Sequence, residues 1–450
     1  MTERLVVIGG DAAGMSAASQ ARRLRPDLEI VVFERGAYTS YAACGLPYVI
    51  GGEVEHVEEL VARTPEQFRA GGIDVRTCHE VVAIDIDHRM VQVAEHGTDT
   101  VQWEGYDELL IATGGSPVRP PLPGIDSEGV YDIRTLPDAE AMRRALDDGA
   151  RSAVIVGGGY IGVEMAESLV HRGLRVTMVE QADQPMLTLD ADMAALVTDA
   201  LVDLGVDVRL GEGVTSFATT GGRVTAVVTG SGSFDADLVV VGLGVRPNAG
   251  LAVDAGIPVG PSGGIAVDER MHTRVDGVWA AGDCVESHHR VSGQQVVVAL
   301  GTHANKQGRV AGTNIGGGTA TFGGVLGTAI TRVGRTEVAR TGLGEREAAA
   351  AGFDALGVAT DAKARAGFLP GAEPMRVKIV AERATGRLLG GQIVGGAGSG
   401  KRIDILATAL WNEMTVVEVG GMDLAYAPPF SPVWDPVLLA AGKAAIQVAS

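Results

Sequence analysis

The order of apolar and polar positions predicts a strand, turn, helix and strand at the start of the chain. Residues 5–8 are uniformly apolar, as in a buried parallel strand, and the turn Gly9-Gly-Asp-Ala-Ala-Gly14 follows them. A helical pattern over 15–24 and a strand over 29–33 that ends at Glu34 complete the unit. In this layout a helix N-terminus faces a pyrophosphate and the terminal carboxylate takes ribose hydroxyls. The pattern predicts a nucleotide-binding βαβ unit, although Asp11 replaces the middle glycine of the fingerprint.

The same pattern recurs further along the chain. A strand over 153–156 leads into Gly157-Gly-Gly-Tyr-Ile-Gly162, and a helix rich in alanine and glutamate connects it to a strand that ends at Glu180. Gly157, Gly159 and Gly162 complete the fingerprint, which predicts a second dinucleotide site. A carboxylate at Glu180 can accept hydrogen bonds from a free 2′-hydroxyl and would repel a 2′-phosphate. We therefore expect NADH to be preferred over NADPH.

Shorter segments mark where the chain passes between domains. Residues 109–117 and 238–247 each form a buried-type strand that ends in glycine and proline. Residues 277–283 place Asp283 directly after another apolar strand, where its carboxylate can meet a ligand hydroxyl. Beyond about residue 320 the fingerprints stop and alternating strands indicate an α+β unit. The predicted fold is therefore α/β, with two Rossmann-like three-layer domains and a C-terminal α+β domain.

Composition and charge exclude several classes of partner. A length of 450 residues suggests about three domains. The net charge of -19, from 37 basic and 56 acidic residues, disfavours nucleic acid and anionic membranes as partners. The chain contains no apolar run of the roughly 18 residues that a membrane span needs. Three cysteines suggest a reducing compartment, and the start at Met1-Thr-Glu-Arg leaves no room for a signal peptide, so we expect a cytoplasmic protein.

The order of these elements resembles the flavin-dependent pyridine nucleotide-disulfide oxidoreductases over nearly the whole chain. The resemblance implies an FAD-binding domain over 1–114 and 244–320, an NAD(P)H-binding domain over 115–243, and a dimerisation domain over 321–450 that makes a homodimer. It implies FAD contacts from Gly9, Gly14, Glu34, Arg35, Thr113, Gly114, Gly244, Gly282 and Asp283. It implies contacts with NADH, or with NADPH, from Gly157, Gly159, Tyr160, Ile161, Gly162 and Glu180.

The segment Ser40-Tyr-Ala-Ala-Cys44-Gly-Leu-Pro-Tyr48 distinguishes the branches of that family. Two-cysteine members carry a CxxxxC pair, but Val49 stands five residues after Cys44, and the tail lacks their His-x-x-x-x-Glu pair. The segment resembles the single-cysteine branch of coenzyme A disulfide reductases, persulfide or sulfur reductases, and NADH oxidases and peroxidases. Cys44 is then redox-active, and we expect a depressed pKa near a helix start and the flavin. We interpret Cys78 and Cys284 as core or flavin-side thiols.

Residues near the first glycine loop bear on the substrate. The oxidases and peroxidases of this branch carry a histidine in the loop, and Ala12 stands there in this chain. The family's coenzyme A contacts map onto Ser16, Gln20, Arg23, Ser40 and His303. The segment 424–431 resembles one that crosses the dimer, and Tyr426 would donate a proton near Cys44 of the other subunit. Three residues depart from the branch and put coenzyme A specificity in question: Ala43 for asparagine, Phe368 for tyrosine and Trp434 for lysine.

The resemblance predicts a flow of electrons from NAD(P)H through FAD to Cys44 and on to a small disulfide or persulfide. The foremost substrate is coenzyme A disulfide, with coenzyme A as the thiol bound at Cys44. One alternative is an NADH oxidase that reduces oxygen through a Cys44 sulfenate. Others are flavin-only electron transfer to a protein partner and a redox-sensing FAD protein. We expect no metal site, since His288-His289 lack a matching carboxylate or thiol cluster.

Overall fold

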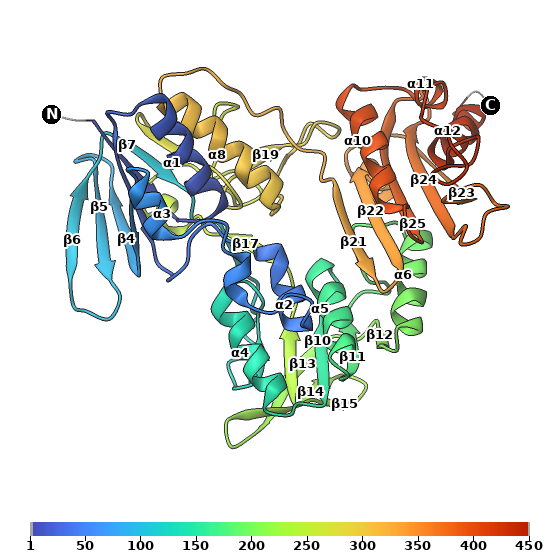
Figure 1. Cartoon of the computed structure of the whole chain (residues 1–450), viewed down its shortest axis with the longest axis horizontal. Helices are drawn as coiled ribbons and strands as arrows, with labels where there is room; N and C mark the ends of the chain where they lie inside the picture. Colours follow the sequence, from blue (N-terminus) through green and yellow to red (C-terminus); the bar gives the residue numbers. More distant parts are fainter. Residues whose placement is uncertain (1–2, 449–450) are drawn as a thin grey trace.

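A computed structural model describes residues 3–448 and shows three lobes (Figure 1). The ends of the predicted first and last domains, residues 1–2 and 449–450, lie outside the described residues. Helix α8 (Gly301–Ile315), from much later in the chain, packs onto the N-terminal residues in the first lobe. A second lobe lies beside the first, and the C-terminal residues form the third lobe. None of the helices within 3–448 combines the length and apolar character needed to cross a membrane.

The first lobe is built on a five-stranded parallel sheet in the order β18-β7-β1-β2-β3. Its strands are β1 (Arg4–Ile8), β2 (Glu29–Glu34), β3 (Asp74–Thr77), β7 (Glu108–Ile111) and β18 (Val278–Ala280). Alternate residues of β1 face opposite sides, because side chains alternate along a strand. Leu5 and Val7 pack under α1 (Ala12–Leu24) and α8 (Gly301–Ile315), whereas Val6 and Ile8 pack toward an antiparallel meander. The meander consists of β4 (His79–Asp85), β5 (Met90–Glu95) and β6 (Val101–Gly105).

The second lobe repeats this design around a parallel sheet in the order β12-β11-β10-β16-β9. Its strands are β9 (Val130–Tyr131), β10 (Ser152–Val156), β11 (Arg175–Glu180), β12 (Asp207–Leu210) and β16 (Leu238–Val241). Helices α4 (Leu136–Asp147), α5 (Tyr160–His171) and α6 (Ala191–Asp203) share one core with Ile155 of the central strand. The other face, with Val154, packs against β13 (Val214–Thr220), β14 (Arg223–Thr229) and β15 (Ser233–Asp235).

Two connecting strands lie together where the chain passes between these lobes. β8 (Gly115–Pro117) pairs antiparallel with β17 (Val245–Pro247). The predicted boundaries at 114 and 244 fall beside this pair and stay a prediction. One segment does not follow these boundaries. Leu46, Val49 and Ile50 of α2 (Leu46–Gly51) precede residue 114 but belong to the core of the second lobe.

The third lobe is a five-stranded antiparallel sheet in the order β21-β22-β25-β24-β23. Its strands are β21 (Ala329–Val333), β22 (Thr336–Gly342), β23 (Ala355–Lys363), β24 (Pro374–Glu382) and β25 (Leu388–Gly395). Its helices are α9 (Glu345–Ala350), α10 (Ile403–Trp411), α11 (Val416–Gly420) and α12 (Pro436–Val448), and they share its core. The α/β architecture with a C-terminal α+β lobe is therefore confirmed.

The remaining elements are short. They are η1 (Ala43–Gly45), η2 (Val57–Leu60), α3 (Pro65–Ala70), α7 (Gly250–Asp254), β19 (Ser287–His288), β20 (Gln295–Val296) and η3 (Gly400–Arg402).

Candidate functional site

The first glycine loop has a shape that only glycine permits. Gly9 has a φ of +106°, and a Cβ there would lie 2.2 Å from the Ala112 oxygen. A Cβ on Gly14 would lie 1.9 Å from the Gly9 oxygen, so this glycine lets α1 begin against the loop. Glu34 at the end of β2 accepts hydrogen bonds from the N–H groups of Gly10 and Gly36, each at 2.7 Å. The carboxylate is thereby held beside the loop.

The second loop has the same geometry. Gly157 has a φ of +102°, and a Cβ on Gly162 would lie 2.0 Å from the Gly157 oxygen. Glu180 accepts hydrogen bonds from the N–H groups of Gly158 at 2.7 Å and Ala182 at 2.8 Å. Each parallel sheet thus ends in a glycine turn, a helix N-terminus and a carboxylate, which is the arrangement that binds a dinucleotide.

A cavity of about 530 Å³ opens at the first loop. It has the size of a small-molecule or cofactor site. Five of the residues predicted to bind a cofactor line it, namely Gly9, Glu34, Arg35, Thr113 and Gly114. Asp283 contacts its wall, because Arg134 lines the cavity and donates to the Asp283 carboxylate at 2.7 Å.

The sequence pattern did not identify Arg134 and Asn248, which also line this cavity. Asn248 holds the two connecting strands together: its carbonyl accepts from the Thr113 hydroxyl at 2.7 Å, and its side chain accepts from Ser116 at 2.7 Å. Arg134 directly precedes Thr135, which caps α4. The one sequence signal that could have identified Arg134 is a cationic residue next to a helix-capping threonine.

Asp11, which stands where the fingerprint has glycine, is the N-cap residue of α1 and also lines the cavity. Burial raises its pKa to about 6, against the opposing effect of a hydrogen bond from the Tyr41 N–H at 3.2 Å, and the nearby Glu34 carboxylate raises it further. Burial thus makes the Asp11 carboxyl of this loop a weaker acid than an exposed aspartate.

Cys44 lies in η1, directly before α2, and its side chain is exposed on the single chain. Pro47 near the start of α2 and three buried apolar residues fix this helix against α5 of the second lobe. In the chain without a flavin the Cys44 pKa is raised and not depressed. The depression expected beside a bound flavin stays a prediction. Partial burial raises the pKa of the thiol and the Glu164 carboxylate raises it further, whereas Arg134 lowers it.

The other two cysteines occupy different environments. Cys284 is completely buried and its thiol contacts the Ala281 oxygen at 3.3 Å, as the interpretation as a core thiol requires. Cys78 is exposed in the turn between β3 and β4 with a φ of +57°. The core alternative is wrong for Cys78, because the turn between the two strands leaves its side chain in solvent, and the flavin-side alternative stays a prediction.

The predicted coenzyme A residues of α1 lie along its contact with α8. Ser16 donates to Asn305 at 2.7 Å, Gln20 donates to Thr313 at 3.1 Å, and Arg23 donates to Gln20 at 2.8 Å. These three side chains follow one another at helical spacing and form a polar row.

Ser40, His303 and Tyr426 lie apart from this row. Ser40, with a φ of +51°, donates its N–H to the Gly10 oxygen at 3.0 Å and ties the segment that carries Cys44 to the glycine loop. His303 lines a separate cavity of about 920 Å³ between α8 and α10, and burial, with Lys306, lowers its pKa. Tyr426 is exposed in the third lobe.

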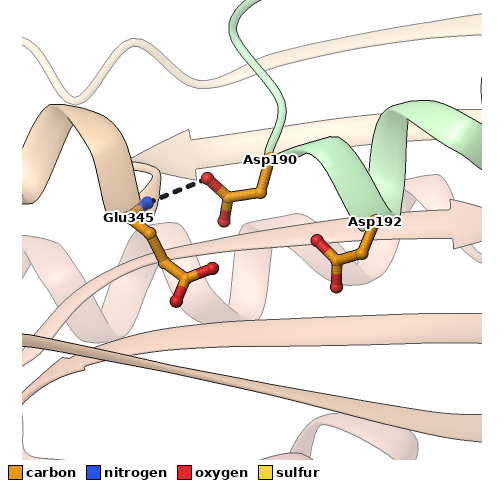
Figure 2. Close-up of side chains that lie close together, drawn as sticks. All are labelled: Asp190, Asp192 and Glu345. Carbon is orange, nitrogen blue, oxygen red and sulfur yellow. Dashed lines mark hydrogen bonds between the residues drawn. The ribbon is translucent and has the colours of Figure 1, made fainter. Parts of the chain in front are cut away.

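Three carboxylates, those of Asp190, Asp192 and Glu345, converge between the second and third lobes (Figure 2). Their spacing would suit a metal ion, but the Lys378 ammonium group makes an ion pair with each of them, at 3.1, 2.7 and 2.5 Å. A cation of the protein thus already occupies the centre of this cluster and offsets part of its negative charge.

Comparison with known proteins relates these sites to a family. The profile of the pyridine nucleotide-disulphide oxidoreductase family matches residues 3–308, and the profile of that family's dimerisation domain matches residues 328–436. The solved structure of an NAD-dependent persulfide reductase from A. fulgidus superposes with a TM-score of 0.96 at 40% identity, covering 99% of this chain and 83% of that chain.

Three curated relatives match almost end to end. The NAD(P)H sulfur oxidoreductase (CoA-dependent) of Pyrococcus abyssi is 40% identical, covering 97% of each chain. The NADH oxidase of Methanocaldococcus jannaschii is 36% identical, covering 98% of each chain. The coenzyme A disulfide reductase of Staphylococcus aureus is 32% identical, covering 95% of this chain and 96% of that protein.

Proposed function

The chain belongs to the pyridine nucleotide-disulphide oxidoreductase family, and we propose that it reduces a coenzyme A-linked disulfide or persulfide through Cys44. The observation that carries this proposal is the position of Cys44. It lies exposed at the start of α2, which packs against α5 of the second lobe, and Arg134 of the first cavity acts on its pKa. The thiol is therefore accessible to a substrate and close to both predicted cofactor sites.

The residues of the first cavity fit FAD. Its glycine turn is too tight for any Cβ, the Glu34 carboxylate lines the cavity where ribose hydroxyls could meet it, and Asp283 is held by Arg134 of the cavity wall. When bound, FAD supplies a two-electron acceptor for hydride. Arg35, Thr113 and Gly114 of the cavity wall would contact FAD, and we expect Gly244 and Gly282 to contribute as well.

The second loop fits the nicotinamide coenzyme, with Gly157, Gly159 and Gly162 under the pyrophosphate and Glu180 on the ribose. Tyr160 and Ile161 begin α5 at this loop. We expect NADH to be the better donor, because the Glu180 carboxylate would repel a 2′-phosphate. A kcat/KM for NADPH equal to that for NADH would contradict this role.

One cysteine is sufficient for the proposed thiol–disulfide exchange. The Cys44 thiolate attacks one sulfur of the substrate, a new S–S bond forms, and the substrate's own S–S bond breaks to release a thiolate. Tyr426 of the partner subunit would protonate that leaving group. Two electrons from NADH then break the Cys44 disulfide and release the second thiol. Overall, NADH, one proton and one disulfide yield NAD⁺ and two thiols, and coenzyme A replaces a second cysteine.

A second candidate is reduction of oxygen through a Cys44 sulfenate, which the similarity to the Methanocaldococcus jannaschii enzyme favours. Ala12 favours disulfide reduction instead, because no imidazole stands at that loop position to meet a peroxide. A flavin-only reductase serving a protein partner would not need the thiol.

Cys44→Ser tests the proposal, with Cys78→Ser as the matched control because Cys78 is also an exposed thiol. Steady-state assays would supply NADH with coenzyme A disulfide, coenzyme A persulfide, oxygen or ferricyanide. We expect Cys44→Ser to lose disulfide and persulfide turnover by about 1000-fold or more and to keep ferricyanide reduction. Cys78→Ser should match the wild type. Equal disulfide turnover in both variants would establish flavin-only transfer, and oxygen as the one Cys44-dependent acceptor would establish the oxidase.

A further inference from the structure

The loop between β11 and α6, residues 181–190, is built onto the second glycine turn. The Met186 N–H donates to the Gly158 oxygen at 2.8 Å, and Met186 adopts a φ of +46° to do so. Pro185 lies against Gly158, where an added Cβ would be 3.2 Å from the Pro185 Cα. Any movement of this loop would therefore move the wall of the turn.

The far end of the loop is held by side chains of the third lobe. Arg346 donates to the Leu187 oxygen at 2.6 Å, and Arg340 donates to the Thr188 oxygen at 2.9 Å. Gln392 accepts from the Asp190 N–H and donates to the Asp190 carboxylate, both at 2.9 Å. Two neighbouring strands of that lobe, β22 and β25, and helix α9 thus contribute to one contact with a short segment.

Lys378 of β24 is the centre of this contact. Its side chain is only 6% exposed, and its ammonium group joins Asp190 and Asp192, at the start of α6, to Glu345, at the start of α9. Figure 2 shows the three carboxylates facing one another, with the Glu345 N–H donating to Asp190. Burial alone would lower the pKa of Lys378, but hydrogen bonds to these carboxylates raise it, so the group stays charged.

Lys378 and Asp190 form a buried ion pair, and Asp192 and Glu345 extend it to the surface. An ion pair with a buried member favours one geometry strongly. Removing an ammonium group from water is costly, and three carboxylates repel one another without it. The attraction between Lys378 and the carboxylates offsets that cost only when the second and third lobes meet in this arrangement. It contributes specificity of position more than net stability.

We propose that Lys378 is a positioning residue for the nicotinamide coenzyme, through which the third lobe holds the 181–190 loop against the second glycine turn. This inference rests on the proposed binding of NADH at that turn. It predicts that the coenzyme affinity depends on a residue of another lobe that does not touch the coenzyme.

Lys378→Met tests the inference, with Lys401→Met as the control because Lys401 is an exposed lysine of the same lobe that pairs with Asp404. We expect the KM for NADH to rise about tenfold in Lys378→Met with kcat at saturating NADH unchanged, since binding and not chemistry is lost. Amide hydrogen exchange of the NADH-free protein should accelerate over 184–190 and stay unchanged in α1 and β1. Lys401→Met should alter neither.

Asp192→Asn is a milder variant for the case that Lys378→Met does not fold, because it removes one ion pair and leaves Lys378 in place. It should give a smaller rise in KM and the same local acceleration of exchange. A lower melting temperature with unchanged KM and unchanged loop exchange would overturn the inference and leave Lys378 a purely structural residue. If Lys378→Met accelerates exchange in the loop but the wild-type protein binds no NADH, the proposed function is contradicted instead.

Discussion

At the scale of single residues, Cys44 stands between groups that act on its thiol in opposite directions. Burial and the Glu164 carboxylate raise its pKa, and Arg134 lowers it. Glu164 is itself partly buried and accepts a hydrogen bond from the Thr331 hydroxyl at 3.0 Å, so the third lobe fixes its position. Because the thiolate is the reacting species, the balance between these neighbours sets the reactivity of Cys44 at neutral pH.

Charge removal at the two neighbours should therefore change the thiol in opposite directions. Glu164→Gln should lower the Cys44 pKa and speed alkylation, and Arg134→Met should raise the pKa and slow it, with about a tenfold rate change for each pKa unit below the titration midpoint. The measurement is the iodoacetamide rate as a function of pH, resolved by peptide mapping so that Cys78 is counted separately. Parallel shifts in both variants would mean that packing and not charge controls the thiol.

The residues that sequence could and could not identify differ in how far apart their partners lie. Gly9, Gly14 and Glu34 belong to one contiguous pattern with a fixed spacing, so their geometry was predictable. Arg134 meets Asp283 across 149 positions of sequence, and no local pattern encodes that contact. The exposure of Cys78 depends instead on local backbone geometry. The sequence around it resembles one continuous strand, but Cys78 lies in a turn with a positive φ.

At the scale of elements, the contact between α1 and α8 holds the polar row of α1 against Asn305 and Thr313 of α8. Two glycines of α8 permit it, since a Cβ would lie 2.2 Å from the Ala13 oxygen at Gly308 and 2.3 Å from the Ala17 oxygen at Gly312. Their spacing of one helical turn was visible in the sequence, but its meaning depends on which helix lies opposite. The two helices can approach so closely only because these side chains are absent.

Gly308→Ala should separate the helices and loosen the first cavity. We expect a loss of about 1–3 kcal/mol in the free energy of unfolding, because the new methyl group meets backbone and not a movable side chain. Gly301→Ala in the same helix is the control, since nothing lies within 4 Å of its added Cβ. Chemical denaturation and the FAD content after purification measure the two effects. Equal stability of both variants would show that α8 can shift without cost.

At the scale of the whole molecule, the repeat of the glycine fingerprint predicted two nucleotide-binding lobes and their order. It did not predict that α2 would complete the core of the second lobe, because an apolar helix fits any core of the right shape. The contact between Lys378 and the 181–190 loop was likewise not visible in the sequence, since Lys378 and Asp192 lie 186 positions apart and in two lobes. Patterns identify repeats and local turns, whereas contacts between lobes depend on the assembled shape.

The third lobe carries an apolar surface around the segment of Tyr426. Phe368, Phe430, Val433 and Trp434 are each at least 62% exposed on the single chain. A surface of this kind on a dimerisation domain is suited to a symmetric contact between two copies. In a two-fold dimer, each active site would then combine Cys44 of one chain with Tyr426 of the other.

Complementation between two inactive variants tests this shared site. The Tyr426→Phe homodimer should be slowed about a hundredfold by loss of the proton donor, and the Cys44→Ser homodimer should be inactive with disulfides. Co-expression with two different affinity tags allows the mixed dimer to be isolated, and one of its two sites then has both an intact Cys44 and an intact Tyr426. We expect the mixed dimer to recover about half of the wild-type disulfide turnover, because the sites of a two-fold dimer are equivalent. If each chain builds its site alone, the mixed dimer has no intact site and turns over at about half the rate of the Tyr426→Phe homodimer.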